Sequence, residues 1–429
     1  MNKNSGLEME TDSENDSSLE TETKKRLDVA HFDLPVHEIR CGFRSAVYFW
    51  RSKRILEQDR HRAHITHQIF QKNEEVKICG TDEALAILKV ATGYFKDYEK
   101  ALALFDEFLA LKQRLQVYPS GADPQVYLHC AKKMAELSLE LDSLWVDQFR
   151  EVEVYALHDG DRLMAWETAM LIEGDYALFA HLESLYLGVL ARRTKIATNS
   201  HRVVQAARGK PVLFFADRFD HFYMQDGDGY AARIGGVSGV ASNAMASWYG
   251  EKGIGTVPHA LIVSYGGDSA LVNAKFSEYF PEINNISLVD FKNDCVQTAL
   301  EAARKLGEKL WGVRLDVAEN VIDRSLQEET HLKDSERYGV TPRLVEKVRT
   351  ALDNEGFQHV KIIVSGGFNP QRIARFEALS APVDVYAVGS WILSGCYDFT
   401  ADAVRLDGKK LAKVGREYRP NPRLEKVNY

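Results

Sequence analysis

The stretch VKIIVSGGFNPQRIARFEALSAPVDVYAVGS, residues 360–390, contains two short apolar runs, each closed by glycine. The runs are Val360–Val364 and Val385–Val388, and they are followed by Gly366-Gly367 and Gly389-Ser390. A continuous apolar run, unlike an alternating one, is typical of a strand that helices cover on both faces. The stretch therefore predicts two parallel strands of an α/β domain, with a glycine turn after each.

Four earlier runs share this character, and helical segments such as residues 295–310 and 341–356 lie between the runs. The earlier runs are Val212–Ala216, Ile254–Val257, Ile286–Val289 and Gly312–Leu315. Two further helices are predicted upstream, over residues 164–192 and 198–208. Alternation of strand and helix over roughly 200 residues indicates a doubly wound sheet or a (β/α) barrel.

Polar and glycine residues stand close behind each of the six runs. They are Arg218, His259, Asp290, the pair Arg314 and Asp316, Gly366 and Gly367, and Gly389 and Ser390. In a barrel the carboxyl ends of the strands converge on one mouth, where catalysis takes place. Arginines, carboxylates and an imidazole around one pocket suit a multiply anionic, phosphorylated ligand held with a metal ion. The glycine turns would let backbone N–H groups approach the phosphate oxygens closely.

The first part of the chain reads differently. Ser45–Asp59 predicts a helix with an apolar stripe, and Gly80–Glu83 is a helix-start signal before an apolar-periodic run. The β-rich runs ITHQIF (65–70) and VEVYAL (152–157) flank these helices. We therefore expect an α+β domain over residues 29–147 and a barrel domain over residues 148–395.

The C-terminal residues contain a hairpin signal. Two alternating runs surround Asp407-Gly408, a dipeptide that favours a two-residue β-turn. We expect residues 396–429 to return to the first domain and to pack on it.

Composition restricts the class of protein. Hydrophobic residues make up 45% and charged residues 27% of the chain, and the formal net charge is −8. These values are ordinary for a globular protein and do not favour binding to nucleic acid or to an anionic membrane. The N-terminal segment is polar and no run of 18 apolar residues occurs, so neither a signal peptide nor a membrane-spanning helix is expected. The five cysteines are scattered, which favours a cytoplasmic location over a disulfide framework.

The extreme N-terminus is acidic. Residues 1–25 carry seven acidic and three basic side chains and almost no large apolar ones. Such a segment buries too little surface to offset its ordering entropy, so a disordered tail is expected over residues 1–28.

Seven stretches carry a resemblance to a known family. They are GFRSAVYFWR, ICGTDEALAIL, TKIATNSHRVVQAARGKPVLFFADR, GTVPHALI, GVRLD, KIIVSGGFN and VYAVGSWI. In order and spacing, from about residue 40 to the C-terminus, they resemble the nicotinate phosphoribosyltransferases, particularly the shorter archaeal-like form. The resemblance implies an N-terminal α/β sandwich and an incomplete α/β barrel. It also implies transfer of phosphoribosyl from 5-phosphoribosyl 1-pyrophosphate to nicotinate in NAD salvage, with Mg²⁺ and coupling to ATP.

The resemblance also implies roles for single residues. His259, in GTVPHALI, matches the histidine that ATP phosphorylates, and Arg218 matches an arginine on the base and ribosyl group. Arg314 and Asp316 match the V-R-L-D motif, in which the aspartate binds ribose or the metal. Tyr48 matches an aromatic residue contributed by the neighbouring subunit, which implies a homodimer with shared sites. The remaining substrate-binding positions implied are Thr256 and Asp290, and Gly366, Gly367, Gly389 and Ser390 for the 5-phosphate.

Base specificity is predicted from one position, and two departures from the family bear on the site. Gly235–Val240 resembles the loop that faces the pyridine substituent, and sister enzymes that take nicotinamide carry aspartate where this chain has Ser238. An uncharged serine does not repel the nicotinate carboxylate, so we expect a preference for nicotinate over nicotinamide of at least about a hundredfold. The departures are Phe219, where the family usually has a second arginine, and Val317–Asn320, where many members read S-G-D.

Other functions remain open from the sequence alone. A sister phosphoribosyltransferase using nicotinamide or quinolinate would have the same fold. A catalytically weak pyridine-nucleotide-binding protein could have kept it, because a fold does not fix a function. The acidic tail could also dock a partner.

Overall fold

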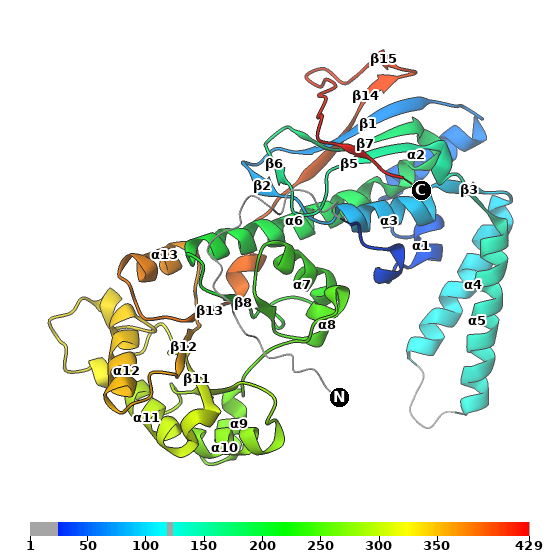
Figure 1. Ribbon diagram of the computed structural model, residues 1–429. Helices are drawn as coiled ribbons and strands as arrows, with labels where there is room; N and C mark the ends of the chain where they lie inside the picture. Colours follow the sequence, from blue (N-terminus) through cyan, green and yellow to red (C-terminus); the bar gives the residue numbers. More distant parts are fainter. Residues whose placement is uncertain (1–24, 118–122, 429) are drawn as a thin grey trace, which may run out of the picture.

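The computed structural model describes residues 25–117 and 123–428, which form two domains joined by a long helix (Figure 1). The helix is α6 (Glu183–Ala206), and each domain is built on a six-stranded sheet of its own. One sheet is antiparallel and the other is parallel. The predicted fold class, an α/β sandwich followed by an incomplete (β/α) barrel, is confirmed.

The first domain has an antiparallel sheet with the strand order β15-β14-β1-β7-β5-β16. Its strands are β1 (His64–Gln71), β5 (Glu153–Ala156), β7 (Thr168–Asp175), β14 (Phe399–Leu406), β15 (Lys409–Lys410) and β16 (Glu425–Lys426). Helices α1 (Val36–Arg40), α2 (Val47–Gln58) and α3 (Thr81–Ala91) belong to this domain. Two small sheets pair β2 (Val76–Lys77) with β6 (Arg162–Leu163) and β3 (Gly93–Phe95) with β4 (Trp145–Asp147). The helices predicted near residues 45–59 and after Gly80 are thus confirmed.

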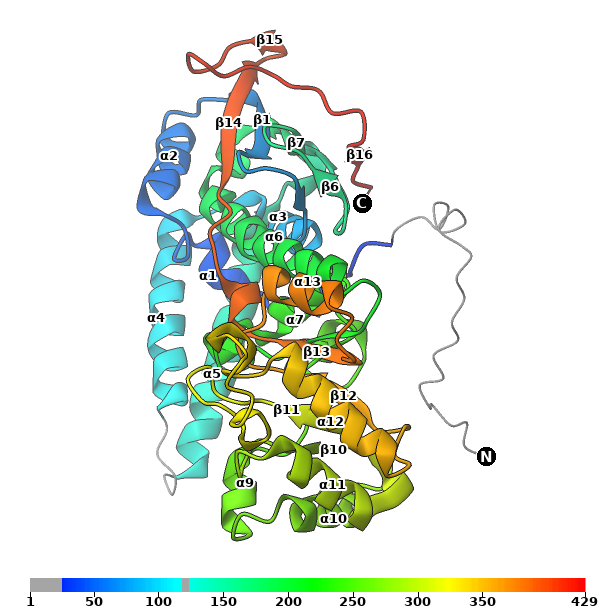
Figure 2. The same cartoon turned by 90° about the vertical axis from the view of Figure 1, so that its left-hand side faces the viewer.

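An antiparallel helical hairpin projects from the first domain. Its helices are α4 (Tyr98–Gln116) and α5 (Pro124–Leu144), and Figures 1 and 2 show them running alongside the barrel without joining it. They share a small core of their own around Phe105, Phe108 and Leu141. No helix in the described part of the chain is both long and apolar enough to cross a membrane.

The C-terminal segment returns to the first domain, as predicted. β14 pairs with β1, and β16 pairs with β5 at the far edge of the sheet. Asp407 and Gly408 both adopt positive φ, 48° and 74°, which is the backbone of the two-residue turn that Asp-Gly favours.

Two predictions for the region after residue 147 are wrong. β5 and β7 pair with β1 in the first sheet, so the first domain extends to Asp175 instead of ending at residue 147. The predicted helix over residues 164–192 begins only at Glu183, because residues 168–175 form β7. β7 lies between two strands and is almost fully buried, so its sequence shows no alternation, and pairing on both edges outweighs its helix-forming residues.

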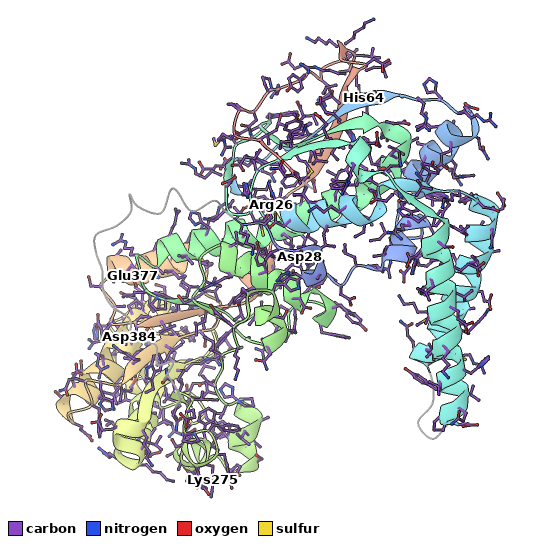
Figure 3. The ribbon with its side chains drawn as sticks, turned by 45° about the vertical axis from the view of Figure 1, so that its right-hand side comes forward. Arg26, Asp28, His64, Lys275, Glu377 and Asp384 are labelled. Atoms are coloured by element: carbon purple, nitrogen blue, oxygen red, sulfur yellow. The ribbon has the colours of Figure 1, made fainter. Side chains whose placement is uncertain are left out.

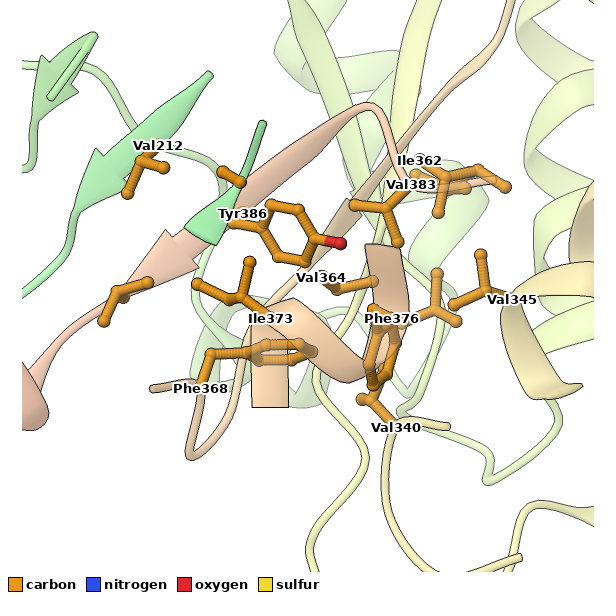
Figure 4. Packing of buried hydrophobic residues seen from close by; sticks show 14 of the residues in the cluster. Val212, Val340, Val345, Ile362, Val364, Phe368, Ile373, Phe376, Val383 and Tyr386 are labelled. Carbon is orange, nitrogen blue, oxygen red and sulfur yellow. The ribbon is translucent and has the colours of Figure 1, made fainter. Parts of the chain in front are cut away.

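The second domain has six parallel strands in the order β10-β11-β12-β13-β8-β9. They are β8 (Val212–Phe214), β9 (Gly239–Val240), β10 (Asn285–Leu288), β11 (Leu310–Leu315), β12 (Lys361–Val364) and β13 (Val385–Val388). The helices are α7 (Gln225–Ile234), α8 (Asn243–Ala246), α9 (His259–Ser264), α10 (Ser269–Tyr279), α11 (Cys295–Leu306), α12 (Pro342–Asn354) and α13 (Pro370–Ala378). Figure 4 shows part of the core between strands and helices. There the centre of the Phe368 ring lies 5.1 Å from that of Phe376 on α13 and 5.6 Å from that of Tyr386 on β13.

The strand predicted at Ile254–Val257 is not formed. The second strand of the barrel is instead β9, which reads Gly-Val and gives no signal in the sequence. Ile254 packs directly over β9, since a Cβ on Gly239 would lie 2.3 Å from the Ile254 side chain. Strands β9 and β10 are the two edges of the sheet, so the barrel is open between them.

Helix α6 holds the two domains together. Tyr186 and Leu190 in its first half are buried in the core of the first domain. Ile196 and Val203 in its second half are buried in the barrel core. One continuous helix therefore fixes the orientation of both sheets.

The predicted tail boundary at residue 28 is wrong by a few residues. The Arg26 guanidinium donates to Asp82 Oδ1 at 2.9 Å and to the carbonyls of Ala156 and Leu157, and the Leu27 amide donates to Asp82 Oδ2 at 2.8 Å. Figure 3 labels Arg26 where the first domain meets α6. The Asp82 carboxylate thus anchors residues 26 and 27 to the first domain. Of the expected tail, only residues 1–24 lie outside the described residues.

A second acid beside Asp82 predicts how stability depends on pH. Burial, together with the charge of Asp82, raises the pKa of Asp159 to about 7. Because the folded state holds this proton more tightly than the unfolded state, stability falls as the pH rises from about 4 to about 7. We expect Asp159→Asn to remove this decrease in stability and to raise the free energy of unfolding at pH 8. Urea unfolding at about pH 4 and at pH 8 measures both effects.

The matched control is Asp33→Asn, at an exposed position of the same domain. It should leave the pH dependence unchanged. An identical slope in the Asp159→Asn variant and the unmutated chain would show that Asp159 does not set it.

Candidate active site

The carboxyl ends of the parallel barrel strands form one rim, and Arg314 lies there near the end of β11. The Arg314 guanidinium donates to Ser365 Oγ at 2.8 Å, to Asp316 Oδ2 at 3.0 Å and to Thr256 Oγ1 at 3.4 Å. Ser365 Oγ in turn donates to Asp316 Oδ1 at 2.7 Å. The guanidinium also lies 5.6 Å from the centre of the Phe215 ring. Arg314, Asp316 and Thr256, predicted from the sequence, are thus brought together in one network.

An acid–imidazole pair lies at the same rim. His259 Nε2 lies 2.8 Å from Asp290 Oδ2, and the imidazole is 43% exposed while the carboxylate is 10% exposed. Burial raises the pKa of Asp290, and the facing imidazole opposes that shift. The sequence predicted that His259 follows a strand. In the structure it instead begins α9, directly after Pro258. It still reaches the carboxyl end of β10 because α9 lies at the open side of the barrel.

One oxygen of this pair bears on metal binding. Asp290 Oδ1 is buried without a hydrogen-bond partner among the described residues, whereas both oxygens of Asp316 are bonded. No group of three or more His, Cys, Asp or Glu side chains in the described ranges is arranged to hold a metal ion alone. Mg²⁺ commonly binds one or two carboxylates and takes its other ligands from substrate phosphates and water. The residues fit such a shared site, and Asp290 fits it better than Asp316.

The turn after β12 has the conformation that glycine favours. Gly366 and Gly367 have φ of 88° and 64°, where a side chain would be strained. The Arg372 guanidinium donates to the Gly366 carbonyl at 2.6 Å and to the Val340 carbonyl at 2.7 Å. A Cβ on Gly366 would lie 3.3 Å from Asp316 Oδ1, so this turn borders the Arg314 network.

The turn after β13 needs glycine for a different reason. A Cβ on Gly389 would lie 2.7 Å from the Phe215 carbonyl and 2.7 Å from the Phe219 ring. Phe219 therefore packs on this turn, and the Arg218 guanidinium lies 5.4 Å from the centre of its ring. Ser390 is exposed and begins a short 3₁₀ helix. The departure at residue 219 thus replaces a possible second cation with a contact to the glycine turn.

Ser238 does not lie at this rim. Its amide donates to the Val212 carbonyl at 2.8 Å, and Val212 is the first residue of β8. β9 begins at Gly239, so Ser238 precedes its strand and lies at the amino end of the parallel sheet. The prediction that Ser238 faces the pyridine substituent is therefore wrong. Ser242 follows β9, where its hydroxyl caps α8 and donates to Gln225.

Tyr48 is also separate from the rim. It lies on α2 and is 63% exposed. Figures 1 and 2 both place α2 beside the first sheet, away from strands β10 to β13. Within one chain, Tyr48 does not approach the Arg314 network.

Ser365 is a site residue that the sequence analysis missed. It directly precedes the Gly366-Gly367 turn and is 4% exposed, and its hydroxyl links the guanidinium and the carboxylate of one strand. Its place after an apolar run and before two glycines was the signal available. For the phosphoribosyl transfer that the family resemblance implies, we expect Ser365→Ala to lower kcat/KM by about 10- to 100-fold with folding unchanged. The loss would come from looser positioning of the Arg314 guanidinium and the Asp316 carboxylate.

The conservative variant checks that this role is positional. Ser365→Thr retains the hydroxyl and should restore most of the lost kcat/KM. If Ser365→Ala keeps the full kcat/KM, the hydroxyl does not position the pair.

Comparison with known proteins was made in both sequence and structure. No family model matches the chain. The chain is 26% identical over 246 residues to one nicotinate phosphoribosyltransferase of Mycobacterium tuberculosis, a match that covers 56% of this chain and 48% of the relative. A second one from that organism is 26% identical over 281 residues, covering 63% and 57%. The Bacillus subtilis nicotinate phosphoribosyltransferase is 24% identical over 273 residues, covering 61% and 51%. The chain thus spans about half the length of these curated relatives.

Solved structures extend the similarity to most of the chain. The nicotinate-nucleotide pyrophosphorylase of Pyrococcus furiosus aligns with a TM-score of 0.66 and 28% identity, covering 91% of this chain and 84% of that one. Human nicotinic acid phosphoribosyltransferase aligns with a TM-score of 0.59 and 15% identity, covering 87% and 77%, and this shows a shared fold. The chain is a homologue of nicotinate phosphoribosyltransferases and has the two-domain fold of the type II phosphoribosyltransferases.

Proposed function

We propose that the chain transfers phosphoribosyl from 5-phosphoribosyl 1-pyrophosphate to nicotinate, giving nicotinate mononucleotide and pyrophosphate. The observation that carries the proposal is the Arg314–Asp316–Ser365 network beside two glycine turns at one barrel rim. The names of the relatives support the same chemistry. The Pyrococcus furiosus protein is named for pyrophosphorolysis of nicotinate nucleotide, which is this reaction in reverse.

The proposed step is a displacement at the anomeric carbon. The pyridine nitrogen of nicotinate forms a bond to C1 of the ribose while the C1–O bond to pyrophosphate breaks, and pyrophosphate leaves with the electron pair. Positive charge develops on the ribose, where the Asp316 carboxylate would stabilise it, and negative charge develops on the leaving group, where Arg314 would do so. The glycine turns would hold the 5-phosphate by backbone N–H groups. Mg²⁺, when bound with Asp290 as a ligand, supplies positive charge to the pyrophosphate.

The proposal includes coupling to ATP through His259. The imidazole is exposed enough to meet a phosphate, and its Nε2 is engaged by Asp290. An uncharged imidazole at neutral pH can accept a phosphoryl group. The preference for nicotinate over nicotinamide rests on the relatives, since Ser238 lies elsewhere.

The deciding experiment identifies the product. The protein is incubated with 5-phosphoribosyl 1-pyrophosphate, Mg²⁺ and nicotinate, nicotinamide or quinolinate, each with and without ATP. Nicotinate mononucleotide formed from nicotinate, faster with ATP, is expected. Product from nicotinamide or quinolinate alone would assign the sister reaction, and no product from any base would favour a binding protein.

The proposal also includes a homodimer with shared sites. Phe43, Val47 and Tyr48 around the start of α2 are each more than half exposed, which leaves an apolar face on the single chain. A symmetric dimer would bury that face and bring Tyr48 to the partner's rim. We expect Tyr48→Ala and His259→Ala chains, each inactive in ATP-stimulated turnover, to recover about a quarter of that turnover when mixed equally, because half the dimers are hybrids with one intact site.

Subunit exchange must be confirmed separately, for example by recovering hybrids through two affinity tags. With exchange confirmed, an absence of recovered turnover would show that each chain contains a complete site.

A further inference from the structure

A cavity lies in the first domain, outside the barrel. It has a volume of about 530 Å³ and is bounded by the end of α2, by β3 and by the 3₁₀ turn Tyr176–Leu178. This volume is within the range of small-molecule sites, roughly 300–1,000 Å³. None of the residues in the Arg314 network lines it.

The walls of the cavity are held together by one buried lysine. Lys53 of α2 is 2% exposed, and its ammonium donates to the Gly93 carbonyl at 2.6 Å and to the Ala177 carbonyl at 2.7 Å. It also forms an ion pair with Glu57 at 3.0 Å. The three segments that bound the cavity are therefore fixed to one another before any ligand binds, which reduces the ordering cost of binding.

The lining is strongly basic. Arg54, Arg60, Arg62 and Lys96 line the cavity together with His61, against a single acid, Glu57. Lys96 comes from the segment after β3, so the basic character is not confined to the end of α2. Cations just after a helix complement its dipole, but that effect does not account for Lys96.

Two of these groups are available to an anion. Arg62 is paired with Asp175 at 2.6 Å, and Arg54 is paired with Glu57. In the described part of the chain, no hydrogen bond or ion pair engages the side chains of Arg60 and His61. Both are exposed at the surface where the cavity opens.

Arg60 occupies a backbone position that glycine usually fills. It has a φ of 53°, and the His61 amide donates to the Leu56 carbonyl at 2.9 Å, which closes the end of α2. Arg208, after α6, also has a positive φ of 49° but does not line this cavity. Strain alone therefore does not mark a site, but it makes Arg60 separable from the fold by a glycine substitution.

One aromatic ring completes the lining. Tyr94 and Phe95 of β3 both border the cavity, but neighbouring strand residues point to opposite faces, and the Phe95 ring packs against Trp145 with the ring centres 4.9 Å apart. Arg54 lies 3.5 Å from the centre of the Tyr98 ring. Aromatic faces stack on flat heterocycles, and free guanidinium groups bind phosphate oxygens. The volume exceeds what a bare diphosphate needs.

We propose that this cavity is a second ligand site, which binds a nucleoside polyphosphate through Arg60 and His61 and its base against Tyr94. The site is independent of the proposed transfer reaction. A failure to find nucleotide binding at this cavity would not count against the proposed transfer reaction.

The test uses the full chain carrying Arg314→Ala, so that the barrel rim contributes little to binding. Equilibrium dialysis with labelled ATP should give about one molecule per chain in this variant, and adding Arg60→Gly should weaken the affinity by about tenfold or more. Thermal unfolding of the Arg60→Gly chain should show an unchanged or higher midpoint, because glycine adopts the positive φ without strain. Loss of binding without loss of stability would identify the guanidinium as a ligand group.

Arg208→Gly is the matched control, since it replaces the same residue type in the same conformation away from the cavity. It should leave ATP binding unchanged. Equal ATP affinity in the Arg60→Gly and Arg208→Gly chains would overturn the proposal, and so would an absence of ATP binding in the Arg314→Ala chain. Pyrophosphate binding as tightly as ATP would overturn the assignment to a nucleotide.

Discussion

The Asp316→Asn variant is expected to lose about a thousandfold in kcat/KM for phosphoribosyl transfer while it folds like the unmutated chain. Asparagine has the shape of aspartate, and its single amide oxygen can still accept from Arg314 while its NH₂ group can donate to Ser365 Oγ, so the network should persist with one hydrogen bond reversed. It lacks the negative charge that would stabilise the positive ribose in the transition state, and charge stabilisation of this kind commonly carries several kcal/mol. Steady-state kinetics with nicotinate measures the loss, and circular dichroism checks the fold.

Asp384→Asn is the matched control for this prediction. Asp384 lies just before β13, at the amino end of the same sheet, where it accepts a hydrogen bond from the Ile362 amide at 2.8 Å (Figure 3). It should retain activity, because its carboxylate is a strand length away from the rim. A normal rate in the Asp316→Asn variant would transfer the carboxylate role to Asp290.

Much of the barrel could be predicted because most of its strands have a clear sequence pattern. Buried parallel strands such as Val385–Val388 read as unbroken apolar runs, and the residues that follow them must share one rim. That rule correctly brought Arg314 and Asp316 beside the Gly366 turn without knowledge of any distance. It did not foresee Ser365, because a serine before two glycines is equally typical of an ordinary turn.

The errors arose where tertiary contacts decide the local structure. β9 has only two residues, so the sequence pattern does not predict where this strand begins and ends. Ser238 was therefore predicted to lie at the wrong end of the sheet. β7 resembles a helix by composition but pairs with strands on both edges. Arg26 belongs by composition to an acidic tail, yet Asp82, which lies 56 residues later, anchors it. In each case the determining partner is distant in the sequence.

The His259→Ala variant is expected to lose all stimulation by ATP and all incorporation of label from γ-labelled ATP. With Nε2 donating to Asp290, the lone pair of His259 is on Nδ1, which is the atom free to attack the γ-phosphorus. The N–P bond would form as the bond to the β-phosphate oxygen breaks, and ADP would leave with the electron pair. Asp290 would fix this tautomer and stabilise the charge that the ring gains, as a carboxylate does for other nucleophilic or basic histidines. We therefore expect Asp290→Asn to slow labelling by about a hundredfold or more without abolishing it.

His221→Ala provides the comparison, because His221 is an exposed histidine in the loop after β8, and in the described residues no hydrogen bond or ion pair joins its imidazole to a carboxylate. It should be labelled and stimulated like the unmutated chain. The difference between Asp290→Asn and His259→Ala separates two roles, since the asparagine can still hold the ring but cannot stabilise its positive charge. Full labelling of the His259→Ala chain would place the phosphoryl group on another residue. Labelling of Asp290→Asn at the normal rate would show that the 2.8 Å contact orients the histidine without activating it.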